Sequence, residues 1–310
     1  MQPSYDSELL NLLTTSVVGR RRELESVVAA LAAGRHLLLE GPPGTGKSTV
    51  LRSVATCTSS GFEFVEGNAE LTPARLVGTF DPSVVLAEGY VAEAFVDGPL
   101  LCALREGALL YIEEINRIPE ETLNLLITVM SEAELHVPRL GRVQAHPGFR
   151  LVAAMNPFDS VGTARIASAV YDRCCRLAMG YQDAGEEEQI VQSAAPLAAD
   201  LIGSNLLRAA VAMVRDSRTH SEIRTGSSVR GAIDFVLVLK ELAELRGTAV
   251  DDPSVTLDAA LLALSGRIRI TEGGSRSAEE IVTELWHRHF APQTEGPPQA
   301  NEQSEAQKKA

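Results

Sequence analysis

The feature that most constrains this chain is a glycine-rich segment at residues 41–48, with the sequence GPPGTGKS. It fits the pattern GxxxxGK[ST], in which backbone N–H groups, a lysine and a hydroxyl together bind the phosphates of a nucleotide. An apolar run at 36–40 precedes it and a helical pattern at 47–57 follows it. We therefore predict a buried strand, then a phosphate-binding loop, then a helix whose positive N-terminal end faces the phosphates.

Strand-like and helix-like segments alternate over the first half of the chain, which predicts an α/β fold with a parallel sheet flanked by helices. The clearest expected strands are 36–40, 62–66, 108–112 and 149–155. Beyond residue 181 the strand patterns stop and amphipathic segments dominate, so we expect a separate C-terminal helical domain. Those segments are about 185–195, 200–216, 227–246, 256–266 and 277–290.

These patterns divide the 310 residues into four parts. We expect an N-terminal segment at 1–16, the α/β domain at 17–180, the helical domain at 181–290 and a disordered tail at 291–310. The tail is rich in Pro, Gln, Glu and Lys and offers almost nothing to bury.

Composition narrows the classes of function. The formal net charge of −13 repels phosphate backbones, which argues against non-specific nucleic-acid binding. No signal-like N-terminus and no apolar stretch long enough to span a membrane is recognisable, and the four cysteines lack CxxC spacing. We expect a cytoplasmic protein without a membrane span.

The phosphate-binding loop predicts ATP and Mg²⁺ as ligands. Lys47 is expected to reach the β and γ phosphates, and the Ser48 hydroxyl to ligate magnesium. The residues expected to contact the nucleotide are Gly41, Pro42, Pro43, Gly44, Thr45, Gly46, Lys47, Ser48 and Thr49.

Two carboxylates follow the expected strand 108–112, at the sheet edge where ligands bind in such folds. Carboxylates there, Glu113 and Glu114, can hold magnesium through water and orient or deprotonate an attacking water. Asn156 follows the strand 149–155 and is expected beside the same edge, where its amide would position the water. An asparagine before Pro157 is also a common turn former, so both interpretations stay open.

Taken with Tyr171-Asp172-Arg173, these motifs resemble the AAA+ superfamily, and within it the MoxR branch, over about residues 15–245. The other segments that carry the resemblance are VVGRRREL at 17–24, EINRIP at 114–119 and MNP at 155–157. The resemblance assigns Walker A to Lys47 and Ser48, Walker B to Glu113 and Glu114, sensor 1 to Asn156, the arginine finger to Arg173 and sensor 2 to Arg230. Within Walker B it implies that Glu113 is on the metal side and that Glu114 is the catalytic residue. It also implies that Gly19 lines the adenine pocket.

The same resemblance implies architecture and partners. Residues 68–97 look like the helix-2 insert, and residues 135–145 like the pre-sensor hairpin. A homo-oligomer is expected, as a hexameric ring in which the finger completes a neighbour's site. A client protein and a von Willebrand factor A domain partner are expected to act with the ring. Relatives usually carry Asp where this chain has Glu113, and Arg176 competes with Arg173 for the finger role.

Four alternatives remain open from the sequence. A nucleic-acid motor or loader is disfavoured by the acidic balance, and a non-hydrolysing nucleotide switch or scaffold is motivated by Glu113. A small-molecule kinase leaves Asn156 and Arg173 unexplained. The gas-vesicle and metal-enzyme activation subgroups share the central motifs and cannot be separated. His287 and His289 are expected to be surface residues rather than metal ligands.

Overall fold

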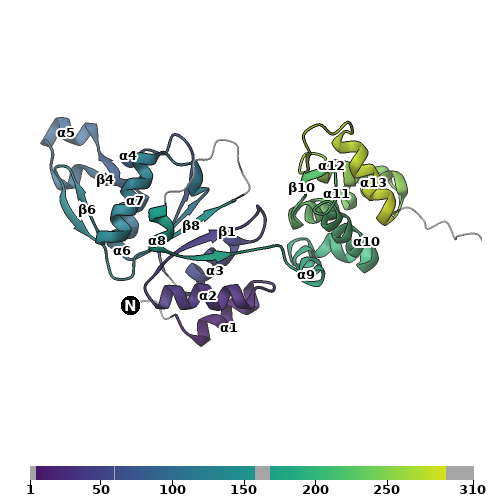
Figure 1. Cartoon of the computed structure of the whole chain (residues 1–310), viewed down its shortest axis with the longest axis horizontal. Helices are drawn as coiled ribbons and strands as arrows, with labels where there is room; N and C mark the ends of the chain where they lie inside the picture. The colour runs from purple at the N-terminus through teal and green to yellow at the C-terminus, as the bar shows by residue number, and fades with distance from the viewer. Residues whose placement is uncertain (1–4, 59, 158–167, 291–310) are drawn as a thin grey trace, which may run out of the picture. The chain divides into compact units, whose positions relative to one another are not determined.

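The computed structural model describes residues 5–58, 60–157 and 168–290 (Figure 1). The chain forms two compact units, one up to Ile190 and one from Val191 onward. This division falls within helix α9 (Ala184–Ala194), ten residues beyond the expected boundary at 180. The expected disordered tail lies outside the described residues.

The first unit is built on a five-stranded parallel sheet in the order β2-β5-β8-β1-β9. Its strands are β1 (His36–Glu40), β2 (Phe62–Glu66), β5 (Leu109–Glu113), β8 (Arg150–Met155) and β9 (Cys174–Ala178). The predicted fold class is confirmed. The sequence did not reveal β9, because this edge strand is only partly buried and has no apolar run.

Side chains alternate between the two faces of the sheet, and each face has its own core. Leu38, Leu110 and Ala153 pack with α4 (Pro73–Val77), α6 (Pro99–Glu106), α7 (Glu120–Glu132) and α8 (Ser168–Arg173). Leu37, Tyr111 and Val152 pack with α1 (Ser7–Ser16), α2 (Arg21–Ala32) and α3 (Lys47–Thr58). Figure 1 shows these two groups of helices on opposite sides of the sheet.

The expected N-terminal segment is part of the core that contains Leu37, Tyr111 and Val152. Asp6 caps α1 by accepting hydrogen bonds from the backbone N–H groups of Glu8 and Leu9, and Leu9 and Leu13 are buried. The segment therefore contributes a helix to the α/β unit.

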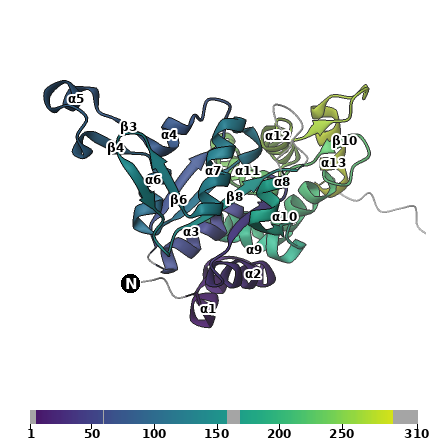
Figure 2. The ribbon, with the colours of Figure 1, turned by 60° about the vertical axis from the view of Figure 1, so that its left-hand side comes forward.

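Two small antiparallel ribbons extend from this unit (Figure 2). One pairs β3 (Gly78–Phe80) with β4 (Phe95–Asp97), and its connection carries α5 (Pro82–Glu88) and the 3-10 turn η1 (Ala92–Ala94). The other pairs β6 (Glu134–Val137) with β7 (Gly141–Gln144). The Arg139 guanidinium lies 3.7 Å from the centre of the Tyr90 ring, so a cation–π contact joins the ribbons.

The second unit is mainly helical. Its helices are α10 (Pro196–Asp216), α11 (Val229–Arg246), α12 (Pro253–Leu264) and α13 (Ala278–Phe290). Gly203 has non-helical angles and kinks α10. A short antiparallel pair, β10 (Ile223–Thr225) with β11 (Arg269–Ile270), corrects the expectation that strands stop at 181; two- and three-residue strands carry no readable periodicity.

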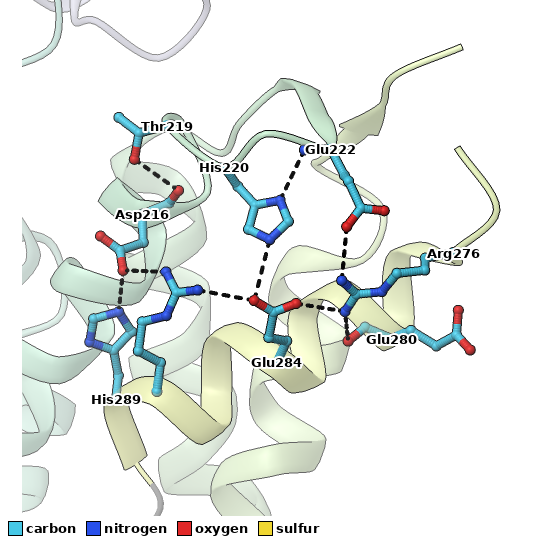
Figure 3. Close-up of polar contacts among 9 residues, drawn as sticks. Asp216, Thr219, His220, Glu222, Arg276, Glu280, Glu284 and His289 are labelled. Atoms are coloured by element: carbon cyan, nitrogen blue, oxygen red, sulfur yellow. Dashed lines mark hydrogen bonds and ion pairs between the residues drawn. The ribbon is translucent and has the colours of Figure 1, made fainter. Parts of the chain in front are cut away.

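An ion-pair network holds α13 against the loop after α10 (Figure 3). Glu284 is its centre and accepts from Arg276 at 2.7 Å and from Arg288 at 3.0 Å. The His220 Nε2 atom lies 3.5 Å from the same carboxylate, and His220 Nδ1 accepts the backbone N–H of Glu222. The network thus fastens the last helix to the unit.

Of the helices in these described ranges, none combines the length and apolar character needed to cross a lipid bilayer.

Candidate nucleotide site

The loop at 41–46 joins β1 to α3 and has the geometry of a phosphate cradle. Gly44 and Gly46 have φ angles of 74° and 82°, a region that glycine adopts without strain. A Cβ on Gly41 would lie 2.1 Å from the Met179 carbonyl oxygen, so only glycine fits there. Gly46 has no atom within 4 Å of its Cβ position, so that side of the loop is open.

Lys47 is the first residue of α3 and is buried. Its ammonium donates to the carbonyl oxygens of Gly41 and Pro42, each at 2.9 Å, which holds the charge against the loop. A cation at the N-terminus of a helix suits a polyphosphate.

Ser48 contacts the end of β5. Its hydroxyl donates to Glu113 Oε1 at 3.1 Å and lies 3.3 Å from the Tyr111 hydroxyl. The two-residue period of a strand explains this grouping, because Tyr111 and Glu113 lie on the face that α3 covers. Burial, opposed in part by the Ser48 hydrogen bond, raises the pKa of the Tyr111 phenol. The sequence did not predict the contact between Tyr111 and Ser48, because nothing in an apolar strand marks one of its side chains as a partner of the loop.

Three neighbouring strands bring the remaining candidates to one edge. In the order β5-β8-β1, Glu113 ends β5 and Glu114 follows it, Asn156 follows β8 and the loop follows β1. The Gly41 N–H donates to the Met155 carbonyl at 3.2 Å, which fixes the start of the loop beside Asn156. Asn156 thus follows the strand between those that carry the carboxylates and the phosphate cradle.

Glu114 turns out of the sheet with a left-handed φ of 54°. Its carboxylate forms a 3.1 Å ion pair with Arg117, and both side chains are more than a third exposed. Non-glycine residues held in this left-handed region cluster at active sites, which makes Glu114 a candidate functional residue.

Arg173 and Arg176 have different positions. Arg173 ends α8, and the next residue, Cys174, pairs in register with His36 at the start of β1. Because β1 rises about 3.3 Å per residue, Cys174, the residue after Arg173, lies roughly 13 Å along the sheet from Glu40, the residue before the loop. It donates to the Ser131 hydroxyl of α7 at 2.5 Å. Arg176 instead pairs with Glu40, the residue before the loop, at 2.5 Å.

Gly19 and its neighbours form a compact turn. Gly19 has a φ of 66°, and a Cβ there would lie 2.3 Å from the Glu186 carboxylate. The adjacent Arg20 is buried and donates to the Gly180 carbonyl at 2.6 Å and the Gln182 side chain at 3.0 Å. The turn is thereby tied to the end of the α/β unit. Arg230 lies near the start of α11, in the second unit.

The Ser48 hydroxyl and the Glu113 carboxylate suit magnesium, because both offer hard oxygen ligands. Mg²⁺ commonly takes one or two protein oxygens, and water and phosphates complete its shell. Within the described ranges no group of three or more His, Cys, Asp or Glu side chains could hold a metal by itself. Of the two histidines expected at the surface, His287 is exposed, whereas His289 is partly buried and lies 2.8 Å from the Asp216 carboxylate.

Comparison with known proteins agrees with this geometry. Residues 36–174 match the family model described as AAA domain (dynein-related subfamily). An uncharacterised protein of Staphylococcus haemolyticus is 30% identical over 207 residues, which cover 65% of this chain and 76% of that protein. This chain belongs to the AAA+ ATPase family.

Relatives of this AAA+ chain with functional names include the gas vesicle ATPases GvpN2 and GvpN1 of Halobacterium salinarum, 33% and 29% identical over 72% and 75% of this chain. The matches span 65% and 66% of the relatives' own lengths.

Solved structures share the AAA+ fold. The crystal structure of a protein described as an ATPase, from Cytophaga hutchinsonii, has a TM-score of 0.52 at 19% identity. The match covers 91% of this chain and 93% of that one. A variant of RuvB from Thermotoga maritima has a TM-score of 0.53 at 18% identity, covering 79% of this chain and 70% of its own.

Proposed function

We propose that this AAA+ chain hydrolyses ATP in a homo-oligomeric ring and uses the energy to remodel a client protein, as an ATPase of the gas-vesicle group. The observation that carries hydrolysis is the grouping of Lys47, Ser48 and Glu113 beside a carboxylate and an amide on adjacent strand ends. A phosphate cradle alone would support binding only.

Each side chain has a proposed task. Lys47 and the loop amides bind the phosphates, while Ser48 and Glu113 hold magnesium, which would neutralise phosphate charge when bound. Glu114 accepts a proton from the attacking water, and Asn156 orients that water. Hydrolysis needs both a binding cradle and a base, and the proposal assigns them to the ends of three adjacent strands.

The arginine finger is proposed to act between subunits. Arg173 lies toward the opposite end of β1 from its own loop, which supports its use on a neighbour's nucleotide. Arg176 is paired with Glu40 of its own subunit, which favours Arg173 for the role. A finger of this kind raises the rate by about 10³ to 10⁵, so assembly would control activity. Arg230 is proposed to sense the nucleotide from the helical unit, and Gly19 to line the adenine pocket.

The gas-vesicle group is favoured over the metal-enzyme group by the names of the relatives. The client is accordingly proposed to be a protein component of gas vesicles. The von Willebrand factor A domain partner and the hexameric ring size rest on the MoxR resemblance and stay predictions.

Phosphate release in the presence of candidate clients tests this function. Purified gas-vesicle proteins should stimulate the wild-type chain, and the Lys47→Ala variant should show no release with any addition. A von Willebrand factor A domain protein and double-stranded DNA are added in parallel. Stimulation by DNA alone would contradict the proposal and favour a nucleic-acid motor.

A further inference from the structure

Glu40 is a charged residue in an apolar setting that no role assigned above explains. It ends β1, immediately before Gly41, and its side chain is only 5% exposed. Its neighbours in the strand, Leu37, Leu38 and Leu39, are all buried core residues. Burying a carboxylate is unfavourable unless it is paired and hydrogen-bonded, so its partners indicate why it is there.

Both oxygens of Glu40 are engaged by the segment that carries Arg173. The Tyr171 hydroxyl donates to Oε1 at 2.9 Å, and the Arg176 guanidinium donates to Oε2 at 2.5 Å. Tyr171 belongs to α8 and Arg176 to β9, and Arg173 ends α8 between them. One carboxylate therefore links both sides of the α8–β9 junction to the strand that leads into the phosphate-binding loop.

The sheet geometry explains how these groups meet. Leu38 faces the core that contains Val170 of α8, and Glu40, two residues on, faces the same way. Arg176 pairs in register with Leu38, so its side chain extends along the strand to reach Glu40. Burial, followed by the hydrogen bond to Glu40, raises the pKa of the Tyr171 phenol, which keeps its hydroxyl a donor.

We propose that Glu40 is a positioning residue for the arginine finger: through Tyr171 and Arg176 it fixes α8 on the sheet and so sets where Arg173 is presented to the neighbouring subunit. This rests on the proposed trans-acting finger. Arg173 itself donates to the Ser131 hydroxyl of α7 and to the Ala169 carbonyl of α8, and it lies 3.8 Å from Asp172, so its position depends on where α8 lies.

A mixing experiment separates this role from any effect of Glu40 on its own loop. Full-length Arg173→Ala supplies an intact nucleotide site without a finger, and full-length Lys47→Ala supplies a finger without a working site. Each is inactive alone, and assembling them together should restore phosphate release at sites where a Lys47→Ala subunit donates Arg173. Adding Glu40→Gln to the Lys47→Ala donor then tests positioning in a subunit that hydrolyses nothing.

Glu40→Gln is expected to fold, because it removes the buried charge and leaves Arg176, whose side chain is 56% exposed, to solvent. The restored kcat should fall about tenfold, because misplacing a reacting group by 1 Å has effects of that order or larger. The KM for ATP should stay unchanged, since the hydrolysing site is untouched. The matched control is Glu121→Gln on the donor, an exposed carboxylate of α7, which should leave kcat as it was.

Tyr171→Phe on the donor removes one of the two links and should give a smaller fall in kcat. Placing Glu40→Gln on the Arg173→Ala receiver instead should not reproduce the effect. If the two parents restore activity and the Glu40→Gln donor performs as well as its control, the positioning role is wrong while the trans-acting finger stands. If the parents restore nothing, the finger assignment and the positioning role fall together.

Discussion

The contact between Ser48 and Glu113 predicts that the longer acidic side chain is required in this chain. Members of the MoxR branch, which the sequence resembles, usually have Asp at this position, so Glu113→Asp introduces the residue that they carry. In this structure the carboxylate reaches the Ser48 hydroxyl at 3.1 Å. Removing one methylene withdraws it by about 1.5 Å, which takes it outside hydrogen-bonding distance.

The size of the effect follows from the charged hydrogen bond that Glu113, at the same reach as its contact with Ser48, would make to a magnesium-bound water. A hydrogen bond to a charged group contributes about 1.5–3 kcal/mol, and Glu113 is only partly buried, so the lower end applies. A loss of about 1.4 kcal/mol corresponds to a tenfold change in an equilibrium constant. We therefore expect Glu113→Asp to need about ten times more Mg²⁺ for half-maximal activity.

The assay is phosphate release across a magnesium titration, with nucleotide binding measured calorimetrically at the same concentrations. Glu113→Gln keeps the length and removes the charge, so it should weaken the magnesium dependence further. Tyr111→Phe keeps both the length and the charge of Glu113 and should have a smaller effect. An Asp variant that needs the same or less Mg²⁺ than wild type would refute the reasoning.

Two predictions concern stability. Arg276 lowers the pKa of Glu284, so the carboxylate stabilises the fold at neutral pH and that contribution is lost as the pH falls through the lowered value. Glu284→Gln should therefore lower the Tm at pH 7, with the difference shrinking below about pH 4. Burial, aided by Arg150, lowers the pKa of His36 to about 4. The unfolded histidine takes up a proton near pH 6.5, whereas the folded one stays neutral down to about pH 4. The free energy of unfolding should therefore fall by up to about 3 kcal/mol between pH 6.5 and pH 4. Denaturant titrations should show this loss for the wild type and not for His36→Gln.

The parallel sheet and its loop could be predicted because their signals are local. An apolar run before a glycine-rich turn identifies β1 and the loop from residues 36–48 alone. The same holds for β5 and β8, whose polar ends lie at one edge once the strands are parallel. The sequence therefore predicted that the candidate site residues would meet at that edge.

Contacts that depend on distant parts of the chain could not be predicted. The partners of Glu40 lie 131 and 136 residues away, and Tyr111 meets Ser48 across 63 residues. In the sequence Glu40 reads as the polar end of an apolar strand. The edge strand β9 was missed for a related reason, since its neighbour in the sheet, not its composition, makes it a strand.

The most direct test of the account is phosphate release per subunit across a series of protein concentrations, for wild type and for Lys47→Ala, Glu114→Gln and Arg173→Ala. Wild-type rates per subunit should rise as the ring assembles, and all three variants should stay low at ring-forming concentration. Activity of Arg173→Ala equal to wild type there, or a wild-type rate independent of concentration, would contradict a nucleotide site shared between subunits.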